Sequence, residues 1–524
     1  MSVQISGIRL SPDALPEELR ERALSILKKK NRDVTAFRVV RESVDARKKQ
    51  VQLVYTVELS LHDETGLPER SDVRRTEPKP PTELPRAAFT SRPVIAGTGP
   101  CGLFCALTLA RAGVPPLILE RGAQVEKRTA AVENYWQGGA LSQRTNVQFG
   151  EGGAGTFSDG KLTTRIHDPR AERVLADFCR FGADEDILYK AKPHIGTDAL
   201  RKVIQNMRAY LISLGCEFRF ETALTDIGVQ NGSVQEIVTE TGEHIPCKML
   251  ILAIGHSARD TYEMLLQKGI AMVQKPFSVG VRIEHLQSDI DRALYGAWAG
   301  HPRLGAAPYQ LSHRVGEDAC YSFCMCPGGI VVAAASETDT IVTNGMSYRA
   351  RSARNANSAL CVNVDRRYFE GDHPLAGVAF QRMLERKAFL LTQGKGAPIQ
   401  TVGSFLKGGT SRFGRVEPSY TGQTVPMDLH GLFPKGITDM LRTGLLQFDK
   451  KIKGFADDDA VLTAPETRTS APVRILRGDT LESISLGGLY PAGEGAGYAG
   501  GIMSAAVDGI RVAEAILQKG DTNE

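Results

Sequence analysis

The sequence predicts an α/β fold on three observations. A short apolar run, Val94 to Ala96, ends at a glycine-rich turn, and the apolar periodicity of a helix follows it. A second apolar run, Leu117 to Leu119, ends in Glu120. Two later runs, 249–254 and 489–492, also lead directly into glycine-containing turns. Short apolar strands that alternate with helices are typical of an α/β domain.

The first turn carries a dinucleotide-binding fingerprint. Gly97, Gly99 and Gly102 fit the pattern G-x-G-x-x-G. The first glycine allows a tight turn, the second lets the backbone approach a pyrophosphate, and the third lets helix and strand pack closely. The helix predicted over 101–112 offers unpaired N–H groups and a positive dipole end to phosphates. Because Glu120 ends the second strand, where a ribose diol would lie, these elements together predict a Rossmann-type nucleotide site.

Two further segments indicate which nucleotide is bound. The glycine-rich stretch 487–509 resembles the C-terminal segment of FAD enzymes of the glutathione-reductase type, which returns the chain to its first domain. That resemblance implies that Glu494 holds the ribityl or pyrophosphate region and that the helix beginning near Gly501 faces the flavin pyrimidine. The turn 255–257 resembles the turn that closes over the adenine half in the same enzymes. Together these segments favour non-covalently bound FAD over NAD.

Several longer sequence motifs are more specific than these glycine-rich segments. They are FGEGGAGTFSDGKLTTR at 149–165, FCMCPGG at 323–329, NGMS at 344–347, NANS at 355–358, ETRTSAPVR at 466–474 and SVDARKK at 43–49. The strings resemble a family of FAD-dependent dehydrogenases found in bacteria and plastids, whose substrates are unassigned. The resemblance covers nearly the whole chain. It implies a flavoprotein oxidoreductase and leaves the reaction open.

The pattern along the chain predicts a modular organisation. Strand and helix patterns before residue 62 indicate a small α+β module, and a polar, proline-rich stretch follows it. The nucleotide signatures disappear at residue 276 and return at 466. We therefore expect a glutathione-reductase-type Rossmann FAD-binding domain with an inserted α+β substrate domain and a small N-terminal α+β module. The predicted boundaries are 1–62 for the module, 63–92 for the linker, 93–275 and 466–520 for the FAD-binding domain, and 276–465 for the substrate domain.

The loop from Gly150 to Arg165 is the predicted place of chemistry. Its glycines let the backbone lie against a planar ring, and Lys161 would stabilise the flavin anion that forms after hydride transfer. The alternative is that the loop binds phosphates and caps a helix. Arg468 is the second catalytic candidate, for an anionic substrate, with ion pairing between domains as its alternative. The predicted cofactor-binding residues are Gly97, Gly99, Pro100, Gly102, Glu120, Arg121, Gly152, Gly153, Gly255, Gly493, Glu494, Gly501 and Ile502.

The cysteines allow two interpretations. Disulfide reductases of this fold carry two cysteines just after the first FAD helix, and the segment 152–161 has none, so a relay at that place is excluded. Cys324 and Cys326 alternate on a predicted strand, so both side chains would face the flavin together as a redox or substrate-contact pair. Small buried core residues are the default alternative. No second pair or suitably spaced histidine accompanies them, so no metal site is predicted.

The amino-acid composition narrows the classes of molecule that the protein is expected to bind. The 524 residues suggest two or three domains, and a net charge of +4 from 64 basic and 60 acidic residues makes nucleic acid an unfavoured partner. No run of 18 apolar residues predicts a membrane span, and the N-terminus lacks the features of a signal peptide. Nine scattered cysteines are typical of a reduced, cytoplasmic protein. The charged turn 45–49 is interpreted as a solvated hairpin tip rather than an RNA contact.

The function predicted from the sequence is an FAD-dependent oxidoreductase. A donor reduces the flavin, which passes hydride or electrons to an unidentified small-molecule substrate, and the reverse direction fits equally. The arginine-rich region 276–465 would suit an anionic substrate. No second G-x-G-x-x-G follows a strand, so NAD(P)H would enter the substrate cleft only transiently as a donor. The alternatives are a flavoprotein that acts on RNA through residues 1–62, and an FAD-binding sensor without catalytic activity.

Overall fold

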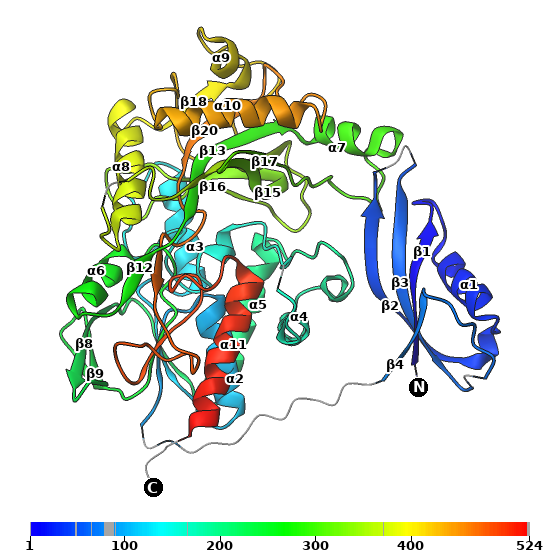
Figure 1. Ribbon diagram of the computed structural model, residues 1–524, viewed down its shortest axis with the longest axis horizontal. Helices are drawn as coiled ribbons and strands as arrows, with labels where there is room; N and C mark the ends of the chain where they lie inside the picture. The colour runs from blue at the N-terminus through cyan, green and yellow to red at the C-terminus, as the bar shows by residue number, and fades with distance from the viewer. Residues whose placement is uncertain are drawn as a thin grey trace.

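A computed structural model describes residues 2–47, 50–63, 65–77, 89, 91–164, 166–369 and 371–520. Within them lie an N-terminal sheet, a parallel sheet with its helices, and a large sheet that packs above the parallel one (Figure 1). The protein is thus a mixed α/β chain, as the sequence predicts. No helix of the described residues is long and apolar enough to cross a membrane.

The N-terminal part is a four-stranded antiparallel sheet in the order β2-β3-β1-β4, with one helix packed on it. Alternate residues of β3 are buried, and the helix buries Leu19, Ala23 and Leu27 against them. Its elements are β1 (Ser2–Leu10), α1 (Pro16–Leu27), η1 (Asn31–Asp33), β2 (Val34–Asp45), β3 (Gln52–Leu61) and β4 (Val73–Thr76).

Strand β4 corrects the predicted linker. Residues 73–76 pair with β1, where Val73 lies opposite Ile5, so this sheet extends beyond residue 62. The strand escaped the sequence analysis because it has four residues and one apolar side chain. Residues 78–88 and 90, which hold the prolines of that segment after Pro68, lie outside the described residues, as do Lys48 and Lys49 of the charged turn.

Backbone pairing docks the N-terminal sheet on the rest of the chain. The N–H of Glu42 donates to Tyr189 O at 2.8 Å, and the N–H of Ala191 donates to Glu42 O at 2.8 Å. Arg303 Nη2 donates to the hydroxyl of Tyr55 at 2.6 Å. The edge strand β2 therefore pairs with another part of the chain at one residue, Glu42.

The parallel sheet has the strand order β22-β11-β5-β6-β7, and all four pairings are parallel. Its three central strands are buried and purely aliphatic, as expected for a sheet covered on both faces. Helices α2 and α11 lie side by side on it (Figure 1). The bounds are β5 (Val94–Ala96), β6 (Leu117–Leu119), β7 (Glu217–Arg219), β11 (Leu250–Leu252), β22 (Leu489–Pro491), α2 (Pro100–Arg111), α5 (Thr197–Ser213) and α11 (Ile502–Lys519).

Smaller elements surround the parallel sheet. A three-stranded antiparallel sheet precedes β11, and several short helices carry the chain around the other edge. These elements are α3 (Val125–Trp136), η2 (Ala154–Phe157), α4 (Arg170–Arg180), η3 (Glu185–Leu188), β8 (Leu224–Gln230), β9 (Ser233–Thr239), β10 (His244–Pro246) and α6 (Arg259–Gln267).

The large sheet runs in the order β14-β15-β17-β13-β20-β18-β19, with β16 paired to β15. One face packs under α10, while the other carries Arg282, Glu284 and Asn357, all buried. Glu284 and Asn357 lie opposite each other in the register of β13 and β17, so they share that face. The elements are β13 (Phe277–Leu286), α7 (Gln287–Tyr295), η4 (Gly296–Trp298), β14 (Ser312–Val315), β15 (Asp318–Ala333), β16 (Thr343–Met346), β17 (Asn355–Val364), α8 (Ala376–Leu391), β18 (Ala397–Thr401), α9 (Val402–Lys407), β19 (Thr424–Pro426), α10 (Lys435–Asp449) and β20 (Val461–Glu466).

Two short strands join the large sheet to the rest of the chain. The chain enters the large sheet after β12 (Met272–Gln274) and leaves it before β21 (Val473–Ile475). The two strands pair in antiparallel fashion, with Met272 opposite Ile475. The two connections therefore lie next to each other, which suits a segment inserted into another domain.

Candidate functional site

Three turns meet at the carboxyl edge of the parallel sheet. They follow β5, β11 and β22, and they pack so tightly that larger side chains would not fit. Gly97 has a φ of +109°, and a Cβ there would overlap the carbonyl oxygen of Ala253. A Cβ on Gly495 would lie 2.6 Å from Gly255 O. Ligands of open α/β sheets bind at this edge, so the convergence of the turns marks a candidate nucleotide site.

The start of helix α2 suits a pyrophosphate. The helix begins at Pro100 after Gly99 and has no side-chain cap. A Cβ on Gly102 would overlap Gly97 O, which explains why the helix can lie so near the turn. A Cβ on Gly99 would meet one atom within 4 Å, the Cα of Gly153 at 3.8 Å. The uncapped helix start, with room for a side-chain atom at Gly99, is therefore a suitable place for a phosphate group.

Glu120 links the first turn to the glycine loop. The side chain is buried and accepts hydrogen bonds from Thr98 N at 3.0 Å, Thr98 Oγ1 at 2.6 Å, Gly122 N at 2.9 Å and Gly150 N at 3.0 Å. A carboxylate has about four acceptor positions, so these donors occupy them. A ribose hydroxyl would have to replace one of these donors, such as the hydroxyl of the buried Thr98. The ribose contact stays a prediction.

Arg121, also predicted to bind the cofactor, lies against α6. Its Nη2 donates to Asp260 Oδ1 and to Thr261 Oγ1, both at 3.0 Å, and its guanidinium stacks over the ring of Phe149 at 4.4 Å. These contacts position the start of the glycine loop. A direct contact between Arg121 and a nucleotide stays a prediction.

Arg128 on α3 holds the glycine loop together, and the sequence analysis missed it. Its guanidinium is fully buried and donates to the carbonyl oxygens of Asn146, Val147, Gly150, Glu151 and Gly153 at 2.7–3.1 Å. Burial lowers the pKa of Arg128 to about 10. In sequence it is one arginine on a polar helix and gives no signal that distinguishes it from a surface charge.

The loop that Arg128 organises lies over the first turn. The N–H of Gly152 donates to Thr98 O at 3.0 Å, and Gly153 contacts Gly99. Glu151 is fully buried, and its Oε2 accepts from Val125 N at 2.8 Å and from Arg208 Nη1 at 2.7 Å. Its Oε1 has no hydrogen-bond partner among the described residues. Burial raises the pKa of Glu151 to about 7.

The C-terminal turn adds a carboxylate and an open helix end. Glu494 Oε1 lies 3.2 Å from Nδ1 of His256, which ties this turn to the one after β11. Gly493 donates its N–H to Asp508 at 2.7 Å, so it holds the turn on α11. A Cβ on Gly501, just before Ile502 at the start of α11, would meet nothing within 4 Å. The predicted residues of this turn therefore line the same edge of the sheet.

Lys161 lies where the glycine loop meets the large sheet. Its Nζ donates to the carbonyl oxygen of Met325 in β15. Arg282 Nη2 donates to the neighbouring carbonyl of Cys324 at 2.7 Å. The candidate Lys161 is thus at the junction of the two parts of the chain, whereas Arg165, at the end of the same string, lies outside the described residues.

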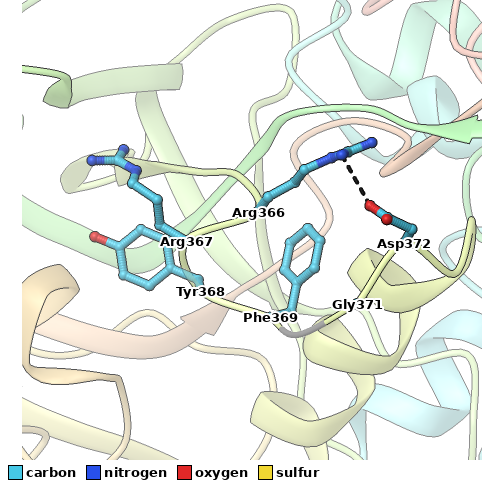
Figure 2. A pocket seen from close by; sticks show the side chains of 6 residues that line it. All are labelled: Arg366, Arg367, Tyr368, Phe369, Gly371 and Asp372. Carbon is cyan, nitrogen blue, oxygen red and sulfur yellow. Dashed lines mark hydrogen bonds and ion pairs between the residues drawn. The ribbon is translucent and has the colours of Figure 1, made fainter.

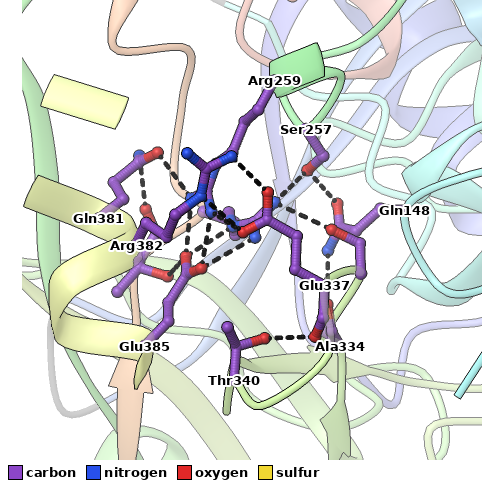
Figure 3. Close-up of polar contacts among 12 residues, drawn as sticks. Gln148, Ser257, Arg259, Ala334, Glu337, Thr340, Gln381, Arg382 and Glu385 are labelled. Atoms are coloured by element: carbon purple, nitrogen blue, oxygen red, sulfur yellow. Dashed lines mark hydrogen bonds and ion pairs between the residues drawn. The ribbon is translucent and has the colours of Figure 1, made fainter. Parts of the chain in front are cut away.

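Arg468 belongs to a buried cluster of charges. Figure 3 shows its partners Ser257 and Glu385 together with Arg259. Arg468 Nε and Nη2 donate to Glu385 at 2.7 Å and 3.0 Å, and its Nη1 donates to Ser257 Oγ at 2.8 Å. Arg259 binds the same carboxylate at 2.8 Å and 2.9 Å. Burial alone would raise the pKa of Glu385, but the charges of Arg468 and Arg259 outweigh it and lower the pKa to about 2. Arg468 therefore makes the ion pair given above as its alternative, and a substrate contact would require that pair to open.

The cysteine pair departs from the predicted alternation. The register of β15 shifts between Phe323 and Cys326, and Cys324 has a φ of +44°. As a result Cys324 is exposed and Cys326 is buried. The expectation that both side chains face the same way is wrong, because a β-bulge interrupts the two-residue period. Among the described residues no three metal-ligating side chains cluster.

An open hollow of about 540 Å³ lies elsewhere, on the loop after β17 (Figure 2). Arg366 and Asp372, which line it, form an ion pair of 3.0 Å, and the ring of Phe369 lies beside this pair. None of the residues that line it is among the predicted site residues. We therefore place the candidate site at the carboxyl edge of the parallel sheet and not in this hollow.

Comparison with known proteins supports FAD as a cofactor of this chain. Residues 276–469 match the family described as FAD-dependent protein, C-terminal domain-like, and residues 2–60 match a domain of unknown function. An uncharacterised protein of Clostridium beijerinckii is 47% identical over 535 residues, which cover 99% of each chain. The chain belongs to the family of this clostridial protein. These matches agree at family level with the resemblance found in the sequence.

Two solved flavoproteins are remotely similar to the chain. The flavin-dependent brominase Bmp2 is 13% identical with a TM-score of 0.37, over 82% of this chain and 79% of the other. CtdE in complex with FAD is 11% identical with a TM-score of 0.33, over 82% and 86% of the two chains. Similarities at this level carry no argument about the activity of the family.

Proposed function

We propose that this protein is an FAD-dependent oxidoreductase that passes hydride or electrons between flavin and a small organic substrate. The observation that carries the proposal is the convergence of three glycine-containing turns and the glycine loop at the carboxyl edge of the parallel sheet. The FAD-dependent family description of residues 276–469 supports it independently. Flavin supplies hydride and electron transfer when bound.

Several residues would hold the cofactor in this proposal. The uncapped start of α2 after Gly99 would face the pyrophosphate, and Glu120 would accept a ribose hydroxyl in place of Thr98. The start of α11 at Ile502 would direct its positive end at the flavin pyrimidine. Arg128 would contact no part of the cofactor. It would keep the glycine loop in the shape that receives it.

Lys161 keeps the role proposed from the sequence, whereas the proposal for Arg468 changes because it is engaged in an ion pair. Lys161 lies between the glycine loop and β15, so its charge would favour the reduced anionic ring. Arg468 reaches the turn after β11 through Ser257 while it binds Glu385. Its role would be to position that turn at the interface, and an anionic substrate would compete with Glu385 for the guanidinium.

The direct test is reconstitution of the cofactor. Purified protein should be yellow and should release FAD, not FMN, when denatured. Gly99→Val should abolish FAD occupancy because its side chain enters the pyrophosphate position, while far-UV circular dichroism stays unchanged. Full FAD retention in Gly99→Val would place the site elsewhere.

Anaerobic titration with NADH, NADPH and dithionite distinguishes the proposed oxidoreductase from an FAD-binding sensor. Bleaching by a nicotinamide would support NAD(P)H as a transient donor. Bleaching by dithionite alone, with no turnover across a metabolite screen, would favour a sensor. RNA that co-purifies with the protein would favour a flavoprotein that acts on RNA.

A further inference from the structure

The bulge in β15 separates two neighbouring thiols. Its register shift removes Cys324 and Met325 from the ladder with β17, and Cys324 takes up a positive φ of +44°. Bulges re-aim side chains and are frequent next to active sites. Cys326 Sγ donates to the carbonyl oxygen of Cys324 at 3.3 Å, so its sulfur lies against the peptide unit that carries the exposed thiol.

The bulge lies in a positively charged environment. Arg282 Nη2 is 3.4 Å from Cys326 Sγ, and its Nη1 binds Glu466 at 3.0 Å. Lys161 adds a second cation at Met325 O, and this charge has no carboxylate partner among the described residues. Asp159 is nearby but is held by Arg351 in a bidentate pair. Two cations and one carboxylate at the bulge leave one positive charge, which acts to lower the pKa of both thiols against the effect of burial.

Burial and charge act against each other on the inner thiol. Burial raises the pKa of Cys326, while the charge of Arg282 lowers it. Burial also raises the pKa of Cys324, to about 11, against the charges of Lys161 and Arg282, although this side chain is the exposed one of the pair. All nine cysteines of the chain are described and free: Cys324 is exposed, Cys179 is half-buried and the other seven are buried. An external reagent therefore meets Cys324 first.

We propose that Cys324 and Cys326 form a thiol–disulfide exchange pair whose substrate is an external disulfide. In the first step the Cys324 thiolate attacks one sulfur of the disulfide. A Cys324–S–S–R bond forms, the original S–S bond breaks, and the leaving thiolate takes up the proton that Cys324 lost. In the second step the bulge must rearrange, because the two side chains face different ways in the structure, and Cys326 Sγ attacks Cys324 Sγ. The second thiolate leaves with the proton of Cys326, so two thiols have been oxidised and one disulfide reduced.

Return of the pair to the dithiol needs two electrons and two protons. In the cell these would come from the reduced flavin, and this part of the inference rests on the proposed function. Lys161 connects the two sites, because it joins the glycine loop to the peptide between the two cysteines. In the test tube dithiothreitol supplies the same electrons without flavin.

Mapping of the products of oxidised glutathione tests the pair. Protein as purified is pre-reduced, incubated with oxidised glutathione, alkylated, digested without reductant and analysed by mass spectrometry. Wild type should form a Cys324–Cys326 disulfide. Cys326→Ser should stop at one glutathione on Cys324, and Cys324→Ser should form neither product. Cys179→Ser is the matched control and should behave as wild type.

Two results would overturn the pair. One is a Cys326→Ser protein in which Cys324 stays unmodified while Cys179 reacts. The other is a wild type in which Cys324 retains glutathione and never passes it on. Because both measurements follow the thiols alone, they stay valid if the protein fails to bind FAD, so failure of the pair is distinguishable from failure of the proposed function.

A reductive titration tests the link to flavin. Oxidised, FAD-loaded wild type should consume twice the dithionite that Cys324→Ser consumes before the flavin is fully bleached, because the disulfide and the flavin each accept two electrons. Equal consumption in proteins that both carry FAD would refute electron exchange between the cysteine pair and the cofactor.

Discussion

Two glutamates on the two sides of the site are equally buried and behave in opposite ways. Burial raises the pKa of Glu151, in the glycine loop, to about 7. Glu385, in the cluster of Figure 3, is as deeply buried, yet Arg468 and Arg259 overcome the effect of burial and lower its pKa to about 2. Glu151 contacts one arginine, Arg208, which also binds Glu126 at 2.6 Å.

The comparison shows that the number of arginines, rather than burial, decides the charge state. Glu385 has two arginines that contact both of its oxygens, so it stays ionised and joins α6, α8 and the segment after β20. Glu151 has an oxygen without a partner, so it is poised to take up a proton near neutral pH. The ionisation of the Glu385 cluster is therefore fixed near neutral pH, whereas the ionisation of the glycine loop depends on pH.

Removal of Glu385 should have the largest effect. Glu385→Ala leaves two buried guanidinium groups without their shared carboxylate, which should cost about 3–5 kcal/mol of unfolding free energy. The measurement is urea unfolding at pH 7. Glu337→Ala is the matched control, because Glu337 also binds Arg259 but is partly exposed, and its loss should be clearly smaller. Equal losses for the two variants would contradict the central place of Glu385.

The same carboxylate predicts a loss of stability in acid. Because the folded pKa of Glu385 is lowered, its contribution is present above the unfolded value of about 4.3 and is lost as the pH falls toward 2. Glu385→Gln should flatten the unfolding curve in this window. An unchanged slope between pH 4.5 and 2.5 would show that the carboxylate is not held in its ionised form.

Glu151 should show the opposite dependence on pH. Its folded pKa is raised, so the folded protein holds more protons than the unfolded chain between about pH 4.5 and 7, and stability falls as the pH rises through that window. At about 1.4 kcal/mol per pKa unit the total is about 3 kcal/mol. Glu151→Gln should remove this dependence, measured by urea unfolding at pH 5 and pH 8.

A second glutamate on Arg208 provides the control for Glu151. Arg208 lowers the pKa of Glu126, and the Glu126 side chain is partly exposed. Glu126→Gln should therefore leave the loss of stability between pH 5 and 8 in place. If Glu126→Gln flattens the curve as much as Glu151→Gln, the glycine loop is not the source of the effect.

Glu120 extends the comparison to a buried carboxylate that four uncharged donors satisfy. Glu120→Ala should weaken FAD binding by about 1.5–3 kcal/mol, because a hydrogen bond to a charged group is lost and the loop is released from the turn. The measurement is the dissociation constant from fluorescence quenching during reconstitution. Thr98→Val is the control, since it removes one donor and leaves the carboxylate. Unchanged affinity in Glu120→Ala would refute the ribose contact.

Lys161 differs from these buried carboxylates, because it is a cation that binds a backbone carbonyl oxygen. Lys161→Ala should leave FAD binding intact and lower the flavin reduction potential, because a nearby cation favours the reduced anion. Lys161→Arg keeps the charge and should restore the potential toward the wild-type value. Potentials that do not differ between the two variants would place the ammonium group away from the ring.

The sequence predicted the turns but not the partners of the buried charges. Gly97, Gly99 and Gly102 could be predicted because local packing requires glycine at each position, and their spacing forms a recognisable pattern. Arg468 and Glu385 are 83 positions apart and Arg259 and Glu385 are 126 apart, so no local pattern connects them. The bulge at Cys324 depends on its pairing with β17, which alternation along one strand does not reveal.

The FAD content of purified protein tests the central claim most directly. Protein expressed without added cofactor is denatured, and the released chromophore is identified by chromatography and quantified per chain. The account predicts one non-covalently bound FAD per chain in wild type and almost none in Gly99→Val. Colourless wild-type protein that cannot be reconstituted with FAD would contradict it.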